Sequence, residues 1–197
     1  MKKTYKSILI ITIIGIILFL VSFYFDAKAL LFMDMIKNPF LDYFLGAVTH
    51  FGSVFIVLII MTTLFMWGER KKEWIPVLWS SFIISTLICI ILKVIVARER
   101  PLELISFFSV LNYSFPSLHA TASFTAIGVL DREFPKFKWF WIMFAFVVAF
   151  SRIYLKVHYL SDVIFGAILG YAIGFIFVHL EERYGVFKKW FIFQKKS

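Results

Sequence analysis

Three short stretches of this chain contain the residue types needed to hold a phosphate group and transfer it to a histidine. They are Lys93 to Pro101 (KVIVARERP), Pro116 to His119 (PSLH) and Ser151 to Asp162 (SRIYLKVHYLSD). They place fixed cations, two histidines and a carboxylate in a chain of 197 residues that is 61% hydrophobic. Ionisable groups in or beside membrane spans are energetically costly, so this combination indicates a functional site.

The first two stretches have the features of an anion-binding site. Arg100 follows Lys93 by seven residues, about two helical turns, so both cations are predicted on one helix face before Pro101 stops the helix. Ser117 is a preferred N-cap residue for a helix that carries His119 in its first turn. The backbone N–H groups of such a turn favour an anion. A lone cation here would be explained by snorkelling to the membrane surface, but the combination is not.

The third stretch has the features of an activated nucleophile. His158 and Asp162 are four residues apart and share a face if the intervening chain is helical. A carboxylate that accepts the ring N–H fixes the tautomer, leaves the other nitrogen free to attack and stabilises the charged intermediate. Ser151 and Arg152 are predicted near the same end of the preceding span. The His-x-x-x-Asp spacing alone is weak, so the prediction depends on all three stretches together.

Six apolar runs are predicted to position these stretches in a bilayer. A span needs about 20 predominantly apolar residues, which the first, third and sixth runs supply, whereas the short fourth run is expected to begin inside the outer leaflet below a folded-in loop. The fold class is therefore all-α: one domain over residues 1–197, a bundle of six transmembrane helices with an interfacial helical segment over 28–38. The runs are Ile8–Phe25, Phe51–Trp67, Ile75–Val96, His119–Leu130, Trp139–Leu155 and Leu160–Leu180.

The distribution of Lys and Arg predicts the orientation. These residues concentrate near both termini and near residues 70–72 and 132–138. Apart from the motif cations, the opposite flanks hold only four basic residues, Lys28, Lys37, Arg98 and Lys156. Both termini are therefore predicted to be cytoplasmic, with the three stretches on the other side. The net charge of +9 is then mainly a topology signal. Nucleic acid binding is the poorer interpretation, because the basic residues are spread over separate short loops.

Three glycines in the sixth run indicate a close helix contact. Gly166, Gly170 and Gly174 are spaced four residues apart, which lets another helix approach closely. We expect this contact to lie inside the monomer rather than in a dimer.

Read together, the stretches are Lys-x6-Arg-Pro, Pro-Ser-x-His and Ser-Arg-x5-His-x3-Asp. This order resembles the type 2 phosphatidic acid phosphatase superfamily, the integral-membrane lipid phosphatases, and the resemblance covers nearly the whole chain. It implies that His158, oriented by Asp162, attacks phosphorus to form phosphohistidine, and that His119 protonates the leaving oxygen. It implies neither a metal nor another cofactor, since arginine and lysine supply the positive charge. The implied phosphate-binding residues are Lys93, Arg100, Ser117, Leu118, Ser151 and Arg152.

Leu118 departs from the family's usual Pro-Ser-Gly-His. Glycine would let a phosphate approach the backbone closely, whereas leucine keeps the N–H donor and adds bulk at the mouth of the site. Pro-Ser-Leu-His is also similar to the inositol phosphorylceramide synthases, which transfer a head group. The intact first motif favours hydrolysis.

The resemblance and the predicted topology imply a lipid phosphate at the outer leaflet of a bacterial inner membrane. Undecaprenyl diphosphate ranks first, because its leaving group is a lipid phosphate, and phosphatidylglycerol phosphate and phosphatidic acid come next. One alternative is a lipid phosphotransferase with an acceptor alcohol. Another is a channel or transporter with a phosphate-binding vestibule, which needs no nucleophile. The expected partners are the lipid substrate and the bilayer, without nucleic acid.

Overall fold

The computed structural model describes residues 2–50, 56–69, 71–102 and 112–188, and its regular elements are all helices. This confirms the all-α prediction for the described residues. The long helices are α1 (Lys2–Ile36), α2 (Pro39–Thr49), α5 (Ile75–Val96), α6 (Leu118–Glu133), α7 (Lys138–Tyr154) and α8 (Leu160–Tyr184). The shorter elements are a π-helix (Ile56–Met61), α4 (Thr62–Gly68) and two 3-10 turns, Lys72–Trp74 and Pro135–Phe137.

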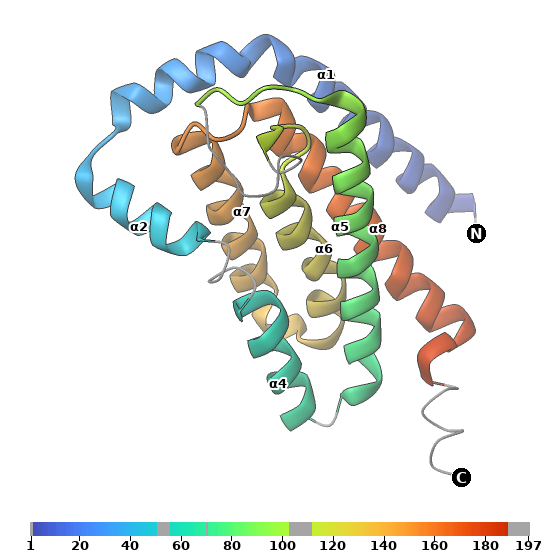
Figure 1. Ribbon diagram of the computed structural model, residues 1–197. Helices are drawn as coiled ribbons and strands as arrows, with labels where there is room; N and C mark the ends of the chain where they lie inside the picture. Colours follow the sequence, from blue (N-terminus) through green and yellow to red (C-terminus); the bar gives the residue numbers. More distant parts are fainter. Residues whose placement is uncertain (1, 51–55, 70, 103–111, 189–197) are drawn as a thin grey trace.

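Helix α6 forms the centre of the bundle, packed against α5, α7 and α8 (Figure 1). Helix α1 crosses the upper end of these helices obliquely and contacts α8 and α7, while α2 packs on α7. The chain that follows α5, the start of α6 and the α7–α8 connection all lie at the end that α1 crosses. The three motif stretches are therefore brought to one end of the bundle.

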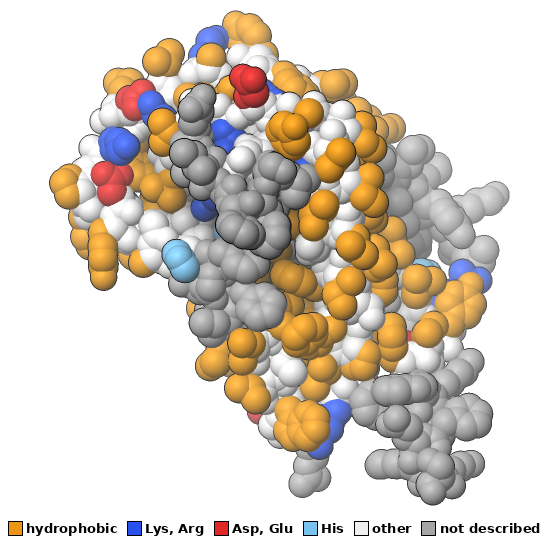
Figure 2. Space-filling model, in the orientation of Figure 1, with side chains coloured by type: hydrophobic (Ala, Val, Ile, Leu, Met, Phe, Trp, Pro, Cys, Tyr) orange, Lys and Arg blue, Asp and Glu red, His pale blue; other side chains and the backbone are white. Residues whose placement is uncertain are grey.

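Among the described residues, four helical segments are long and apolar enough to cross a membrane: Ile13–Ile36, Lys72–Val96, Pro135–Tyr154 and Leu160–Tyr184. The other two predicted spans correspond to shorter elements. Helix α6 has 16 residues, and the predicted run Phe51–Trp67 begins with five residues that lie outside the described part. Hydrophobic side chains cover much of the face over α5, and charged side chains gather mainly towards the two ends (Figure 2). The chain is a multi-pass membrane protein, and a count of six spans stays a prediction.

The first helix is longer than expected. A span ending at Phe25 was predicted, followed by an interfacial segment over 28–38, but α1 continues without a break to Ile36. Residues 26–36 contain Ala, Leu and Met, which are good helix formers, and no glycine or proline. The break falls instead at Asn38, whose side chain accepts the Leu41 N–H at 3.0 Å and so begins α2.

The glycines of α8 lie against α6 in the same chain, as predicted. A Cβ atom on Gly170 would lie 2.1 Å from the carbonyl oxygen of Thr121, and one on Gly174 would lie 2.3 Å from that of Thr125. The hydroxyls of these two threonines donate to the carbonyl oxygens of Ser117 and Thr121, one turn earlier in the chain, so both hydroxyls are satisfied at this contact. This close packing fixes the start of α6 against the start of α8.

Candidate active site

Backbone and side-chain hydrogen bonds join the three motif stretches. The Ser114 N–H donates to the Arg98 carbonyl oxygen at 2.7 Å, which links the chain before α6 to the chain after α5. The Ser117 N–H donates to the Asp162 carbonyl oxygen at 3.1 Å, which links the starts of α6 and α8. The Arg100 Nη1 donates to the Val157 carbonyl oxygen at 3.1 Å. Residues up to 57 positions apart in sequence are therefore bonded directly to one another.

Lys93 lies in the last turn of α5 and is 1% exposed. Its Nζ donates to the carbonyl oxygens of Tyr113 at 2.6 Å and Ser114 at 3.4 Å. A buried ammonium group needs such acceptors. Lys93 is thus held against the segment that leads into α6.

Arg100 lies beyond the end of α5, so the prediction that it shares a helix face with Lys93 is wrong. The helix ends at Val96 because Ala97 adopts a left-handed conformation with φ of 47°, and its N–H caps the Lys93 carbonyl. Arg100 instead reaches the site from a segment without regular secondary structure, and its Nε donates to the Asn112 carbonyl oxygen at 2.9 Å.

Ser117 occupies the N-cap position of α6, as predicted, but its hydroxyl does not cap the helix. The side chain is 0% exposed, and its Oγ has no hydrogen-bond partner among the described residues. A buried hydroxyl without a partner is costly, and a phosphate oxygen would satisfy it. Leu118 is the first helical residue and His119 lies in the first turn; both are partly buried.

His158 and Asp162 form a buried pair, 1% and 0% exposed, with His158 Nδ1 3.6 Å from Asp162 Oδ2. They do not share a helix face, because α8 begins at Leu160, after His158. A helix cap aligns the carboxylate instead: Asp162 is the third residue of α8, and its Oδ2 accepts the Tyr159 N–H at 2.8 Å. A gap of 3.6 Å exceeds hydrogen-bond length, and such contacts often shorten when substrate binds.

Arg152 is 8% exposed and lies near the end of α7. Its Nη1 donates to Thr49 Oγ1 at 2.9 Å, whereas its Nε has no hydrogen-bond partner among the residues that the structure describes. The Arg152 carbonyl oxygen accepts the His158 N–H at 3.2 Å, and Arg152 is the cation with the largest electrostatic effect on the His158 imidazole. Ser151 donates its hydroxyl to the Val148 carbonyl oxygen at 2.6 Å, so its contact with phosphate stays a prediction.

The site is electropositive around His158. Burial lowers the pKa of His158 well below its usual 6.5, and the positive charges of Arg152, Lys93 and Arg100 lower it further. His119 lies within electrostatic reach of His158 and of the same three cations. The imidazole of His158 is therefore neutral at physiological pH, as a nucleophile must be, and the surrounding charge favours an anion.

Sequence reasoning missed three residues that contact this site: Asp26, Thr49 and Arg98. Arg98 was assigned to the topology signal, but its Nη1 donates to Asp162 Oδ1 at 2.7 Å and its Nη2 to Asp26 Oδ2 at 2.8 Å. Two signals could have found this pair. Arg98 lies inside the first motif, and Asp26 is the first acidic residue of the chain, next to an apolar run. Thr49 carries no signal of its own.

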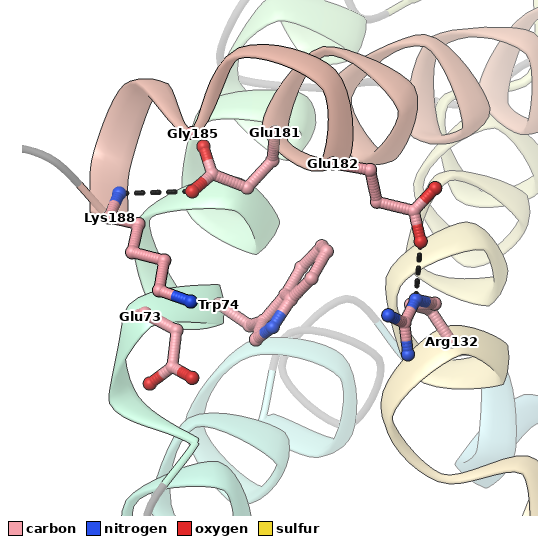
Figure 3. Close-up of a pocket in the computed structure, with 7 residues that line it drawn as sticks. All are labelled: Glu73, Trp74, Arg132, Glu181, Glu182, Gly185 and Lys188. Atoms are coloured by element: carbon pink, nitrogen blue, oxygen red, sulfur yellow. Dashed lines mark hydrogen bonds and ion pairs between the residues drawn. The ribbon is translucent and has the colours of Figure 1, made fainter.

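A separate pocket of about 420 Å³ lies at the other end of the bundle, beside the C-terminus of α8 (Figure 3). Its polar groups bond to one another: Arg132 pairs with Glu182, and Glu181 accepts the N–H groups of Phe187 and Lys188, each at 2.9 Å. The motif residues do not line it. Helix α8 ends here at its C-cap residue Gly185, which is left-handed and donates its N–H to the Glu181 carbonyl oxygen, so the pocket is separate from the motif residues.

Comparisons with known proteins agree with this arrangement. The chain is 29% identical to the lipid A 4'-phosphatase of Bacteroides thetaiotaomicron over 80% of its own length and 77% of the relative's. It is 30% identical to the undecaprenyl-diphosphatase of Sulfolobus acidocaldarius over 72% of the chain and 70% of that relative. The crystal structure of Aquifex aeolicus LpxE superposes with a TM-score of 0.66 at 27% identity, covering 78% of this chain and 94% of LpxE. The family model for the PAP2 superfamily matches residues 74–185, which include every motif residue described above. This membrane protein belongs to the PAP2 superfamily.

Proposed function

We propose that the protein is a lipid phosphatase that removes the terminal phosphate of a membrane lipid phosphate through a phosphohistidine intermediate. The observation that carries this proposal is the buried His158–Asp162 pair, 3.6 Å apart, set among Lys93, Arg100 and Arg152. A neutral, oriented imidazole beside three cations suits attack on phosphorus and stabilisation of the charge that develops there.

In the proposed first step, the lone pair of a His158 ring nitrogen forms a bond to phosphorus. The bond between phosphorus and the lipid oxygen breaks, and His119 gives a proton to that oxygen. Lys93, Arg100 and Arg152 hold the non-bridging oxygens, and the Ser117 hydroxyl and the first N–H groups of α6 complete the cradle. Asp162 stabilises the positive charge that His158 acquires.

In the second step, water attacks the phosphohistidine. His119, which lost its proton in the first step, accepts a proton from this water, the bond between nitrogen and phosphorus breaks, and inorganic phosphate leaves. Both histidines return to their starting states. The positive charge needed throughout comes from side chains of the chain itself.

We rank undecaprenyl diphosphate first as the substrate, followed by phosphatidylglycerol phosphate and phosphatidic acid. The ranking follows the leaving group, because a lipid phosphate departs more easily than an alkoxide. The relatives named above act, by their names, on lipid A and undecaprenyl diphosphate, which supports an anchored phosphate as the common feature. We also propose a bacterial inner-membrane location with both termini cytoplasmic and the site on the extracytoplasmic side.

The test is phosphate release from these three lipids by the purified protein in detergent. His158→Ala should abolish release, whereas His179→Ala should not, because His179 is an exposed residue of α8 that stacks on Phe175. An acid-labile phosphoryl adduct should form on the wild type and not on His158→Ala. Release that survives in His158→Ala would refute the nucleophile, and no release from any lipid would refute the function.

The same experiment separates hydrolysis from transfer. An acceptor alcohol added to the assay should leave phosphate as the main product. If a phosphoryl-linked head group moves to the alcohol and phosphate release stops, the protein is a phosphotransferase.

A further inference from the structure

Arg98 has a different environment from the cations assigned to the phosphate. Both of its terminal nitrogens are bound to carboxylates, Nη1 to Asp162 Oδ1 at 2.7 Å and Nη2 to Asp26 Oδ2 at 2.8 Å. Nη1 also donates to the Ser161 hydroxyl at 2.7 Å, and the guanidinium carbon lies 3.9 Å from the centre of the Tyr159 ring. Arg98 therefore bridges two carboxylates and is not directed to a phosphate.

Asp26 connects α1 to the start of α8. Its Oδ1 accepts the Ser161 N–H at 2.8 Å, and its Oδ2 accepts the Ser161 hydroxyl at 2.6 Å in addition to Arg98. Asp26 is 7% exposed although it lies in a helix long enough to span the membrane. A buried ion pair adds little net stability compared with apolar packing, so stability alone does not explain a charged bridge at this position.

The bridge determines how Asp162 faces His158. Of the two carboxylate oxygens of Asp162, Oδ1 is held by Arg98, and Oδ2 accepts the Tyr159 N–H and faces His158 Nδ1. Arg98 in turn is held by Asp26. Two fixed contacts on the carboxylate prevent its rotation, and a fixed carboxylate fixes the imidazole.

We propose that Asp26 and Arg98 are positioning residues that orient the Asp162 carboxylate toward His158, so that α1 is part of the active site. This inference rests on the proposed function. It also extends the site beyond residues 74–185, which match the family model, because Asp26 lies on the helix that crosses the motif end of the bundle (Figure 1).

The charges of the bridge give the proposal a distinctive test. The ionisable groups that act on His158 are Lys93 of α5, Arg100, His119 of α6, Arg152 of α7 and Asp162 of α8. Asp26 offsets the charge of Arg98. Asp26→Asn leaves Arg98 less compensated and disfavours the protonated imidazole, so the acid limb of kcat/KM should move to lower pH. Arg98→Gln removes the cation and should move the acid limb to higher pH, each by about one pH unit.

Turnover should respond as well. Both variants should lower kcat by about tenfold or more, because small displacements of a reacting group are costly. KM should change little, since neither side chain is directed to the phosphate. Asp26→Asn/Arg98→Gln should bring the acid limb back toward its wild-type position, because both charges are removed together, and Arg98→Lys should retain more activity than Arg98→Gln.

Asp34→Asn is the matched control. Asp34 is also an α1 carboxylate, and it pairs with Lys156 in the α7–α8 connection without contacting Asp162. It should leave kcat and the pH profile unchanged. The proposal would be overturned if Asp26→Asn had the same kcat and pH profile as Asp34→Asn. It would also be overturned if the acid limbs of Asp26→Asn and Arg98→Gln shifted in the same direction. In either case an active wild type leaves the proposed function intact. Should Arg98→Gln not fold, Asp26→Asn and Arg98→Lys decide by the same measurements. A wild type without turnover would count against the proposed function itself.

Discussion

Replacing Gly170 with alanine tests whether the contact between α6 and α8 sets the geometry of the active site. The added Cβ would lie 2.1 Å from the Thr121 carbonyl oxygen, 2.9 Å from its carbonyl carbon and 3.0 Å from the Thr125 nitrogen. Real Cβ atoms essentially never approach closer than 3.0 Å, so the helices must separate by about 0.9 Å, the difference between 3.0 and 2.1 Å. All three atoms belong to the backbone of α6, and no side-chain rotation relieves the clash.

This separation predicts both a stability loss and an activity loss. Overpacking a tight contact costs about 1–3 kcal/mol, and we expect the upper end because backbone must move. At about 2–4 °C per kcal/mol for a chain of this size, the Tm should fall by about 6–12 °C. The start of α6 carries Ser117 and His119, and the start of α8 carries Asp162. A shift approaching 1 Å between them should lower kcat by about a hundredfold.

The assay measures thermal unfolding by tryptophan fluorescence in detergent, together with phosphate release. Gly46→Ala is the matched control, because Gly46 is also helical and a Cβ there would meet nothing within 4 Å. That variant should keep full activity and gain up to about 1 kcal/mol, since alanine is the better helix former. If Gly170→Ala matched Gly46→Ala in Tm and turnover, the reasoning about the α6–α8 contact would be refuted.

Three further predictions concern the chemistry. Burial and then the neighbouring cations hold the pKa of His158 below 6.5, so the acid limb of kcat/KM that reports protonation of His158 should lie below pH 6.5. A decrease in kcat/KM that depends on His158 and begins above pH 6.5 would contradict the assignment of His158 as the nucleophile. His119→Ala should slow a phosphomonoester more than a diphosphate, because an alkoxide needs the proton more than a phosphate does, and equal losses would argue against His119 as the acid. Leu118→Gly should change the ratio of diphosphate to monoester turnover while hydrolysis continues to depend on His158, and an unchanged ratio would show that Leu118 does not determine substrate choice.

Local sequence was sufficient to predict the motif residues and the helices that carry them. Lys93 at the end of α5, Ser117 at the N-cap of α6 and the apolar runs over α5, α7 and α8 could be predicted because each depends on neighbouring residues. The glycines of α8 were also placed correctly against another helix, because small residues at a spacing of four let helices approach closely.

The errors arose where the backbone departs from a helix. Arg100 was assigned to a helix face by spacing, but Ala97 ends α5 early. His158 was expected to share a face with Asp162 if the intervening chain were helical, but α8 begins only at Leu160. A left-handed alanine carries no sequence signature, unlike a glycine. Asp26 could not be paired with Arg98 because the contact joins residues 72 positions apart, and sequence spacing does not report such long-range contacts.

The compensation of charge in the described site is itself an argument for an anionic ligand. Arg98 is matched by Asp26 and Asp162, and this bridge is closed within the protein. The cations assigned to the phosphate are treated differently: Lys93 is bound to carbonyl oxygens, and Arg152 to a threonine hydroxyl. Neutral acceptors hold a cation in position without cancelling its charge, and a buried uncancelled charge is costly unless something else cancels it. Under the proposed function, the carboxylates fix the nucleophile and the remaining positive charge is left for the phosphate.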